Sequence, residues 1–266
     1  MSRFPSLVCC CLGLTLLSAS HPGEGIRNPG HQPAATSTQE VLIAAAADLQ
    51  FAMDSVSKAF SSGENDISIK LVYGSSGHFY EQIINDAPFD IFFSADLGYP
   101  EKLEQQHKTL SPVKPYGTGQ LVLWSKKLDP SREGMNSLLL SSVTHIAIAN
   151  PAHAPYGQRA EESLKHYQLY DKVREKLVIG ENISQTAQFA STGAADIGII
   201  ALSLALSPQL QTEGKYWLIP PDTHQPLKQG FVLLQHAKGN EGANKFAAFI
   251  GSAKARAILK YFGFDE

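Results

Sequence analysis

Small, polar or hydroxylic residues stand at four places in the sequence where an apolar run of strand type gives way to a helical pattern. No Lys or Arg occurs among them. Neutral donors of this kind suit a dehydrated oxyanion, because the first turn of a helix leaves backbone N–H groups unpaired at the positive end of its dipole. Several helix starts aimed at one point form an anion site without a cation, and serine hydroxyls add donors that rotate to fit. The four junctions are Ala47-Asp48, Gly74-Ser75-Ser76-Gly77, Pro155-Tyr156-Gly157 and Asn182-Ile183-Ser184.

An ordinary structural role accounts for the same residue types, since Ser, Asp and Asn before a helix are common N-caps. The turn at Ser75 and Ser76 stands out because it has two hydroxyls, and because Gly74 and Gly77 on either side allow close backbone approach. From composition and spacing alone, the prediction is a two-lobed α/β binding protein whose ligand stays open.

Short apolar strands alternating with amphipathic helices must position these junctions. Residues 41–47 form a small apolar run, and the apolar residues of 49–60 recur at a spacing of three to four. The alternation continues to two final helices over 243–250 and 253–262. This pattern predicts parallel-rich sheets with helices on both faces. Ligands of such sheets bind beyond the carboxyl ends of the strands.

Two Gly- and Pro-rich breaks, Pro115–Gly119 and Pro220–Gly230, divide the pattern. We therefore expect one lobe formed by residues 40–118 and 223–266, with a second lobe, residues 119–222, inserted into it. The two chain crossings would act as a hinge, and the cleft between the lobes would hold the ligand.

The amino terminus has the pattern of a secretory signal peptide. It has a basic residue at Arg3, an apolar run to Leu17 and small residues before a cleavage point near Ser20. The apolar run is shorter than the roughly 20 residues of a membrane span. We interpret residues 1–20 as the signal peptide and 21–39 as a flexible leader, which predicts a periplasmic protein. A buried N-terminal helix is the alternative.

Composition excludes several classes of function. The net charge of −3 leaves no basic surplus for a nucleic-acid partner. The three cysteines, Cys9, Cys10 and Cys11, all lie in the predicted signal peptide. A mature chain without cysteine has no disulfide, thiolate metal site or cysteine nucleophile. Lipidation of one cysteine is a further alternative, which their early position in the apolar run disfavours.

Enzyme chemistry is not indicated either. No Ser–His–Asp or paired-carboxylate arrangement occurs at the four junctions, so we expect no catalytic residue and no cofactor. A transferase on the same fold is the alternative from another class. His78 and His153 lie near the predicted site. Two scattered histidines do not form a metal constellation, so we expect no direct metal-ion ligands.

Motifs over residues 40–264, nearly the whole mature chain, resemble the periplasmic molybdate-binding proteins of ABC transporters and occur in that family's order. The most specific block is APFDIFFSAD, residues 87–96. The resemblance implies the two-lobed type II periplasmic binding protein fold, with molybdate or tungstate held by hydrogen bonds alone. It also implies a membrane permease with its ATPase as partners, and we expect a monomer. The other motifs are AAAADL at 44–49, YGSSG at 73–77, NPAHAPYG at 150–157, ENI at 181–183, IGII at 197–200 and KYFGF at 260–264.

The resemblance also implies a ligand set. It places Ser76 at a serine that donates both N–H and hydroxyl, with Ser75 beside it. It places Tyr156 and Ile183 where backbone N–H groups are donated from the second lobe. Asp48 stands where the family often has a serine ligand, and Ala201 stands where it often has a tyrosine whose hydroxyl binds.

An ionised Asp48 would repel a dianion strongly at short range, so three accounts stay open. Its side chain turns away to cap its own helix and leaves only the N–H at the ligand. Alternatively, a shift in register lets Ala47 make the contact. In the third account, Asp48 accepts a proton from a protonated anion such as hydrogen phosphate, which would change the ligand to phosphate; sulfate is a further alternative oxyanion. We hypothesise that the Tyr156 hydroxyl replaces the one lost at Ala201.

Overall fold

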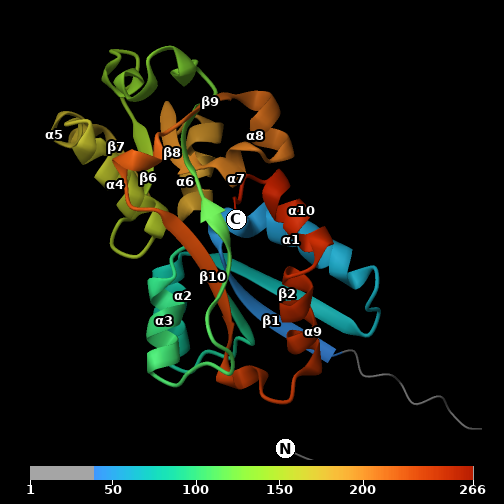
Figure 1. Cartoon of the computed structure of the whole chain (residues 1–266). Coiled ribbons are helices and arrows are strands. Elements are labelled where there is room, and N and C mark those ends of the chain that lie inside the picture. Colours follow the sequence, from blue (N-terminus) through green and yellow to red (C-terminus); the bar gives the residue numbers. More distant parts are fainter. Residues whose placement is uncertain (1–38, 266) are drawn as a thin grey trace, which may run out of the picture. The chain divides into compact units, whose positions relative to one another are not determined.

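A computed structural model describes residues 39–265 (Figure 1). The predicted signal peptide and all but the last residue of the predicted leader lie outside the described residues. None of the described helices combines the length and the apolar character that a membrane span requires.

The first of two five-stranded sheets has the strand order β2-β1-β3-β10-β4. The strand β1 (Gln39–Ala46) lies between β2 (Ile67–Gly74) and β3 (Ile91–Ser94) and runs parallel to both. The strand β10 (Leu227–Leu233) runs antiparallel to β3 and to β4 (Lys114–Gly119). The inner strands β1 and β3 read as continuous apolar runs because both faces of the sheet are covered by helices.

Helices cover both faces of this first sheet, and we call the whole assembly lobe 1 (Figure 1). One face packs against α1, α9 and α10 through an apolar cluster that includes Met53, Phe93 and Phe246. The other packs against α2 and α3 around Phe92 and Leu103. These helices are α1 (Gln50–Ser61), α2 (Ser76–Ile84), α3 (Gly98–Gln105), α9 (Glu241–Ile250) and α10 (Ala253–Tyr261), with the 3-10 turns η1 (Ala47–Leu49) and η6 (Gln235–Ala237).

The second sheet has the order β7-β6-β8-β5-β9, and with its helices it forms lobe 2. The strand β6 (Ile146–Ala149) runs parallel to β7 (Leu177–Gly180) and β8 (Ile197–Ala201). The strand β5 (Leu121–Ser125) runs antiparallel to β8 and β9 (Lys215–Leu218). The helical elements are η2 (Pro130–Arg132), η3 (Gly134–Leu139), α4 (Pro155–His166), α5 (Tyr170–Val173), η4 (Arg174–Lys176), α6 (Ile183–Thr192), α7 (Leu202–Ala205), α8 (Pro208–Glu213) and η5 (Pro221–Thr223).

The sheets are mixed: each combines the expected parallel pairs with antiparallel pairs. The predicted break at Pro115–Gly119 is the edge strand β4. An edge strand tolerates proline because one side of it makes no ladder hydrogen bonds. The second predicted break, Pro220–Gly230, contains the start of β10 at Leu227. A Gly- or Pro-rich stretch therefore marks a sheet edge here as well as a loop.

The predicted core is confirmed where the apolar runs are longest. Phe92, Phe93 and Trp124 are fully buried. The Trp124 indole N–H donates to the Leu210 carbonyl at 3.2 Å, which satisfies its one polar atom inside lobe 2. The packed sheets fix the positions of the strand ends, and the strand ends fix the helix starts.

Candidate functional site

A small cavity lies where the two lobes meet, beyond the carboxyl ends of β1, β2 and β6. All five residues predicted for the ligand site line it, although they come from four separate segments of the chain. The fold therefore brings the predicted junctions together. The lining residues are Ala46, Ala47, Asp48, Gly74, Ser75, Ser76, Ala95, Ala154, Pro155, Tyr156 and Ile183.

Three helices begin at this cavity. Ser76 and Ile183 are the first residues of α2 and α6, and Tyr156 is the second residue of α4. Their backbone N–H groups have no acceptor within their own helices. The N-cap side chain of Asn182 accepts the N–H of Gln185, so it satisfies a later donor of α6 and leaves the first one available. The arrangement supplies converging neutral donors at positive helix ends.

The two serines differ in what their hydroxyls can do. Ser76 is 1% exposed, and its Oγ accepts the Ala95 N–H at 3.0 Å, which leaves its hydroxyl hydrogen to donate. Ser75 Oγ accepts the His78 N–H as the N-cap of α2 and is hydrogen bonded to His153 Nδ1 at 2.9 Å. The Ser76 hydroxyl hydrogen therefore remains available for donation at the cavity, whereas the Ser75 hydroxyl caps a helix and joins the lobes.

Asp48 lines the cavity with a buried carboxyl group. Its Oδ2 accepts from Gln229 Nε2 at 2.8 Å, and its Oδ1 has no hydrogen-bond partner among residues 39–265. Burial raises its pKa to about 6, although Gln229, the Tyr156 hydroxyl and the N–H groups of Asp48 and Leu49 act in the opposite direction. The carboxyl group is thus turned toward Gln229, which also contacts the Tyr156 hydroxyl.

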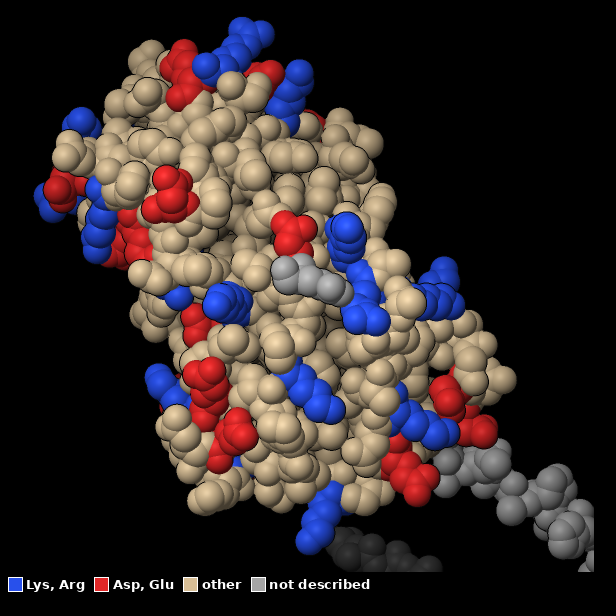
Figure 2. Space-filling view, viewed as in Figure 1, with Lys and Arg blue, Asp and Glu red and all other residues tan. Residues whose placement is uncertain are grey.

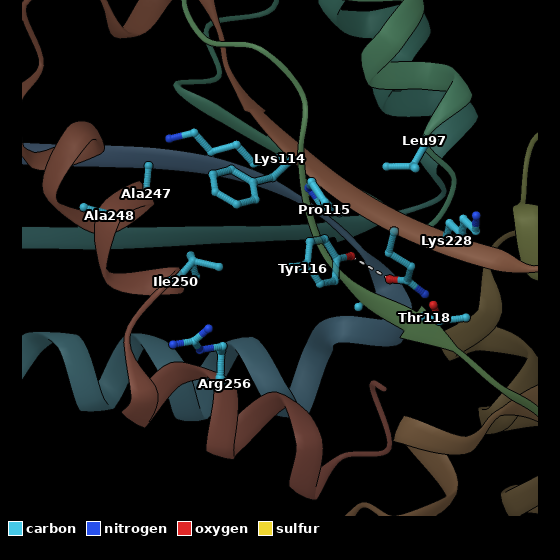
Figure 3. A pocket seen from close by; sticks show the side chains of 14 residues that line it. Leu97, Lys114, Pro115, Tyr116, Thr118, Lys228, Ala247, Ala248, Ile250 and Arg256 are labelled. Carbon is cyan, nitrogen blue, oxygen red and sulfur yellow. Dashed lines mark hydrogen bonds between the residues drawn. The ribbon is translucent and has the colours of Figure 1, made fainter. Parts of the chain in front are cut away.

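Gln229 and Tyr116 complete this network, and sequence reasoning missed both. Gln229 is fully buried and its Nε2 also donates to the Tyr156 hydroxyl at 3.1 Å. Its Oε1 accepts from the Tyr116 hydroxyl at 2.6 Å, a bond visible in Figure 3. The Tyr156 hydroxyl therefore points into the protein, and burial followed by the nearby Asp48 carboxyl raises the pKa of Tyr156 well above its usual value. A polar chain runs from the cavity into lobe 1.

A larger pocket lies on the other side of Tyr116 and Gln229, between β4, β10, α9 and α10 (Figure 3). Lys114, Lys228 and Arg256 contribute to its wall. None of the predicted ligand residues lines it, so its size alone does not make it the candidate site.

Direct contacts between the lobes surround the small cavity. Ser184 Oγ of lobe 2 donates to the Ala47 carbonyl at 2.9 Å, and Ser203 Oγ donates to the Asp48 carbonyl at 2.7 Å. The Gly77 N–H of lobe 1 donates to the His153 carbonyl at 2.9 Å. The described lining contains no Lys or Arg, and these three contacts between the lobes are made by uncharged groups.

Comparison with known proteins identifies the family of this chain. The family model described as bacterial extracellular solute-binding protein matches residues 41–265. The chain belongs to this family. The molybdate-binding protein ModA of Azotobacter vinelandii is 35% identical to this solute-binding protein over 233 residues, which cover 86% of this chain and 91% of the relative. The ModA of Rhodobacter capsulatus is 34% identical and covers 85% and 88%.

The solved structures agree with the predicted fold. The periplasmic molybdate-binding protein of Azotobacter vinelandii superposes on this solute-binding protein with a TM-score of 0.80 at 31% identity, covering 85% of this chain and 99% of that chain. The two-lobed periplasmic binding protein fold is confirmed, with mixed sheets. The family consists of binding proteins, not enzymes.

Charges on the solute-binding protein are dispersed on the face seen in Figure 2, where Lys and Arg side chains are interspersed with Asp and Glu. Near the cavity, Arg159 forms salt bridges with Asp96 at 3.1 Å and with Glu162 at 2.7 Å, so its charge is paired with two carboxylates. Ala201, where the resemblance led us to expect a tyrosine ligand, is buried and is not part of the cavity lining.

His78 and His153 lie side by side at the edge of the site. Their rings stack with centroids 3.7 Å apart, and Glu181 lies beside them. Burial and the neighbouring His78 lower the pKa of His153, while Glu181 acts in the opposite direction. Two residues 75 positions apart meet because α2 and the loop before α4 face each other across the cavity.

Proposed function

We propose that this protein captures molybdate in the cavity between the lobes and delivers it to the permease of an ABC importer. The observation that carries the proposal is the convergence of three helix starts and the free Ser76 hydrogen on a buried cavity lined without cations. Relatives at 34–35% identity that are named for molybdate support the choice of oxyanion.

The proposed ligand contacts are neutral donors. The N–H groups of Ser76, Tyr156 and Ile183 and the Ser76 hydroxyl would each donate to an oxygen of the dianion. Hydrogen bonds to an ionised acceptor are roughly twice as strong as neutral ones. Ser75 would contribute through its backbone, because its hydroxyl is already engaged. Asp48 would lie close to the anion, and its carboxyl group would repel the anion least when protonated and neutral.

Binding would couple to movement of the lobes. We propose that a hinge at the two chain crossings, between β4 and β5 and between β9 and β10, opens and closes the cavity. The protein would act as a monomer in the periplasm after removal of a signal peptide, with the permease and its ATPase as partners. Tungstate, nearly isosteric with molybdate, would bind the same donors, and smaller sulfate would be rejected because fixed donors cannot all reach it.

Hydrogen phosphate is the second candidate ligand, favoured by one observation. Asp48 has a buried Oδ1 without a partner, and an ionised carboxylate there would accept a proton from a protonated anion. Molybdate near neutral pH has no proton to offer.

Calorimetric titration of the mature protein with molybdate, tungstate, sulfate and phosphate tests the proposal. Heat with molybdate and tungstate is expected, and heat with phosphate alone would reject the ligand assignment. The Ser76→Ala variant should bind molybdate roughly 10- to 150-fold more weakly, since a hydrogen bond to a charged group contributes about 1.5–3 kcal/mol. The matched control is Ser61→Ala, an exposed position at the end of α1. Equal affinity in both variants would mean that the site is misplaced.

A further inference from the structure

We propose that His78, His153 and Glu181 form a binding site for a divalent transition-metal ion of the Zn²⁺ class, spanning the two lobes beside the oxyanion cavity. His78 lies in the first turn of α2 in lobe 1. His153 and Glu181 lie in lobe 2, on the loops that precede α4 and α6. Histidine and glutamate side chains are ligand types that zinc uses. The proposed contacts to the oxyanion do not require a metal ion at these three residues.

The ligand atoms already lie near the geometry of a metal site. His78 Nδ1 is 2.7 Å from Glu181 Oε1, and His153 Nε2 is 4.0 Å from the same oxygen. One ligand atom from each residue falls within 4.8 Å of the others. In a tetrahedral zinc site with bonds of roughly 2.0–2.1 Å, neighbouring ligand atoms are about 3.3 Å apart. The two printed separations bracket that value, and the stacked rings of His78 and His153 would turn apart to seat the ion.

The donor set selects among cations. Two imidazoles and one carboxylate, with a fourth position open to water, match a known zinc arrangement. Imidazole ligands favour Zn²⁺, Cu²⁺ and Ni²⁺ over Mg²⁺ and Ca²⁺, which prefer oxygen. His78 and Glu181 are about half exposed and His153 is 15% exposed, so an ion can enter from solvent.

Neighbouring groups hold His153 in place for this role. Its Nδ1 is hydrogen bonded to Ser75 Oγ at 2.9 Å, which leaves Nε2 facing Glu181. A metal-binding histidine commonly has its second ring nitrogen fixed in this way. The backbone is held too, because the Gly77 N–H donates to the His153 carbonyl. A Cβ at Gly77 would lie 2.6 Å from that oxygen, so only glycine allows this approach of α2.

A metal ion at this position would act on oxyanion binding. It would join the lobes directly, and it would lie one residue from the cavity, because Ser75 belongs both to the cavity lining and to the His153 contact. If zinc and molybdate both bind more tightly when the lobes are joined, each raises the affinity of the protein for the other by the same factor, because coupling is reciprocal. This coupling, unlike the metal site itself, rests on the proposed molybdate function.

Zinc titration of the tag-free mature protein, without oxyanion, tests the metal site. Calorimetry should give one Zn²⁺ per chain, and His78→Ala, His153→Ala and Glu181→Gln should each weaken binding by tenfold or more. Co²⁺ should give the visible absorption of a four-coordinate ion in the wild type only. His166→Ala, at an exposed position at the end of α4, is the matched control and should bind as the wild type does. Circular dichroism verifies that each variant is folded.

Absence of zinc binding by the wild type, or equal binding by the folded variants, would overturn the metal site. The second result would leave the cross-lobe His78–Glu181 pair as an exposed ion pair of little energetic weight.

Molybdate titration with and without zinc tests the coupling. Zinc should raise the affinity for molybdate by about fivefold or more in the wild type, at the low end of typical coupling, and leave Glu181→Gln unchanged. Zinc binding without any change in molybdate affinity would overturn the coupling alone. A chain that binds zinc but never molybdate would refute the proposed function and keep the metal site.

Discussion

Asp48 and Asp196 are both buried carboxyl groups, yet their surroundings are opposite. Asp196 stands at the amino end of β8 in lobe 2, away from the cavity. It accepts from Lys127 Nζ at 2.7 Å and from the Thr144 N–H and hydroxyl, both at 2.9 Å. The His145 N–H adds a further bond at 3.0 Å. Burial alone would raise the pKa of Asp196, but these partners outweigh it and hold the pKa below its usual value.

Asp48 has one good side-chain partner, Gln229, and its pKa is raised. The difference teaches how to separate structural from functional acids in this fold. A carboxylate that only stabilises the chain is given as many donors as it can accept. Asp48, which lines the small cavity, is left with acceptor capacity. We therefore expect its protonation to depend on what occupies the cavity.

The Asp196→Asn variant tests whether Asp196 stabilises the fold, and it has the largest expected effect. The change removes the ion pair with Lys127 and turns an amide N–H₂ toward groups that donate. We expect a loss of about 3 kcal/mol in the free energy of unfolding, measured by urea denaturation. Molybdate affinity should stay the same. Asp171→Asn, an exposed position on α5, is the control. A loss of under about 0.5 kcal/mol would remove the contrast between the two acids.

Asp48→Asn should have the opposite effect on stability. The pKa of Asp48 rises from 3.8 to about 6 on folding, so the folded chain binds more protons between these values. The free energy of unfolding therefore falls as pH rises from about 4 to 6. The full shift corresponds to about 3 kcal/mol.

The asparagine variant should avoid most of that loss, because its amide oxygen takes the place of Asp48 Oδ2 as the acceptor for Gln229 Nε2. We expect it to be more stable than the wild type by roughly 2 kcal/mol at pH 7.5 and equally stable near pH 4. Urea denaturation without oxyanion at both pH values measures this. A variant that is less stable at pH 7.5 would show that Asp48 is as well satisfied as Asp196.

Binding itself should report the protonation of Asp48. A dianion favours the neutral carboxyl, so above pH 6 each bound molybdate should take up a proton. Affinity should then fall up to about tenfold for each pH unit between 6 and 8, or 1.4 kcal/mol. Asp48→Asn should bind with no such slope. Calorimetry in buffers of different ionisation enthalpy counts the proton directly. A phosphate-binding protein would show the reverse, with Asp48→Asn weakening the ligand.

Local sequence pattern located the helix starts at the cavity and missed Gln229 and Tyr116. The helix starts at Ser76 and Ile183 were predictable because a strand, a turn and a helix follow one another within a few residues. Gln229 meets Asp48 from a position 181 residues away. It lies on β10, in a stretch whose Gly and Pro residues predicted a break. No spacing rule connects such positions, since only the packing of the two sheets brings them together.

The same limit applied to the histidines and to the sheets. His78 and His153 meet only because α2 faces the loop before α4. The parallel halves of both sheets followed from the alternation of strands and helices. The antiparallel strands β4 and β5 carry the chain between lobes, and their direction depends on tertiary connections that no local pattern records.

The smallest effect is expected at Tyr116, the far end of the Asp48 network. Its hydroxyl donates to Gln229 Oε1 and thereby turns the amide N–H₂ toward Asp48 and Tyr156. Tyr116→Phe removes this donor and should cost about 1 kcal/mol of stability. A less firmly held amide stabilises the ionised carboxyl less, so the pH midpoint of molybdate binding should move upward slightly. Tyr261→Phe, at a position 68% exposed, is the control.

Both readouts matter for Tyr116, because a loss of stability alone would fit any buried hydroxyl. A shift of the binding midpoint without contact between Tyr116 and the ligand cavity would mean that the protonation of Asp48 is set by its hydrogen-bonded neighbours as well as by its burial. An unchanged midpoint would assign the raised pKa to burial alone. The contrast with Asp196 would then come from the number of donors each carboxyl meets directly, and the orientation of Gln229 would have no part in it.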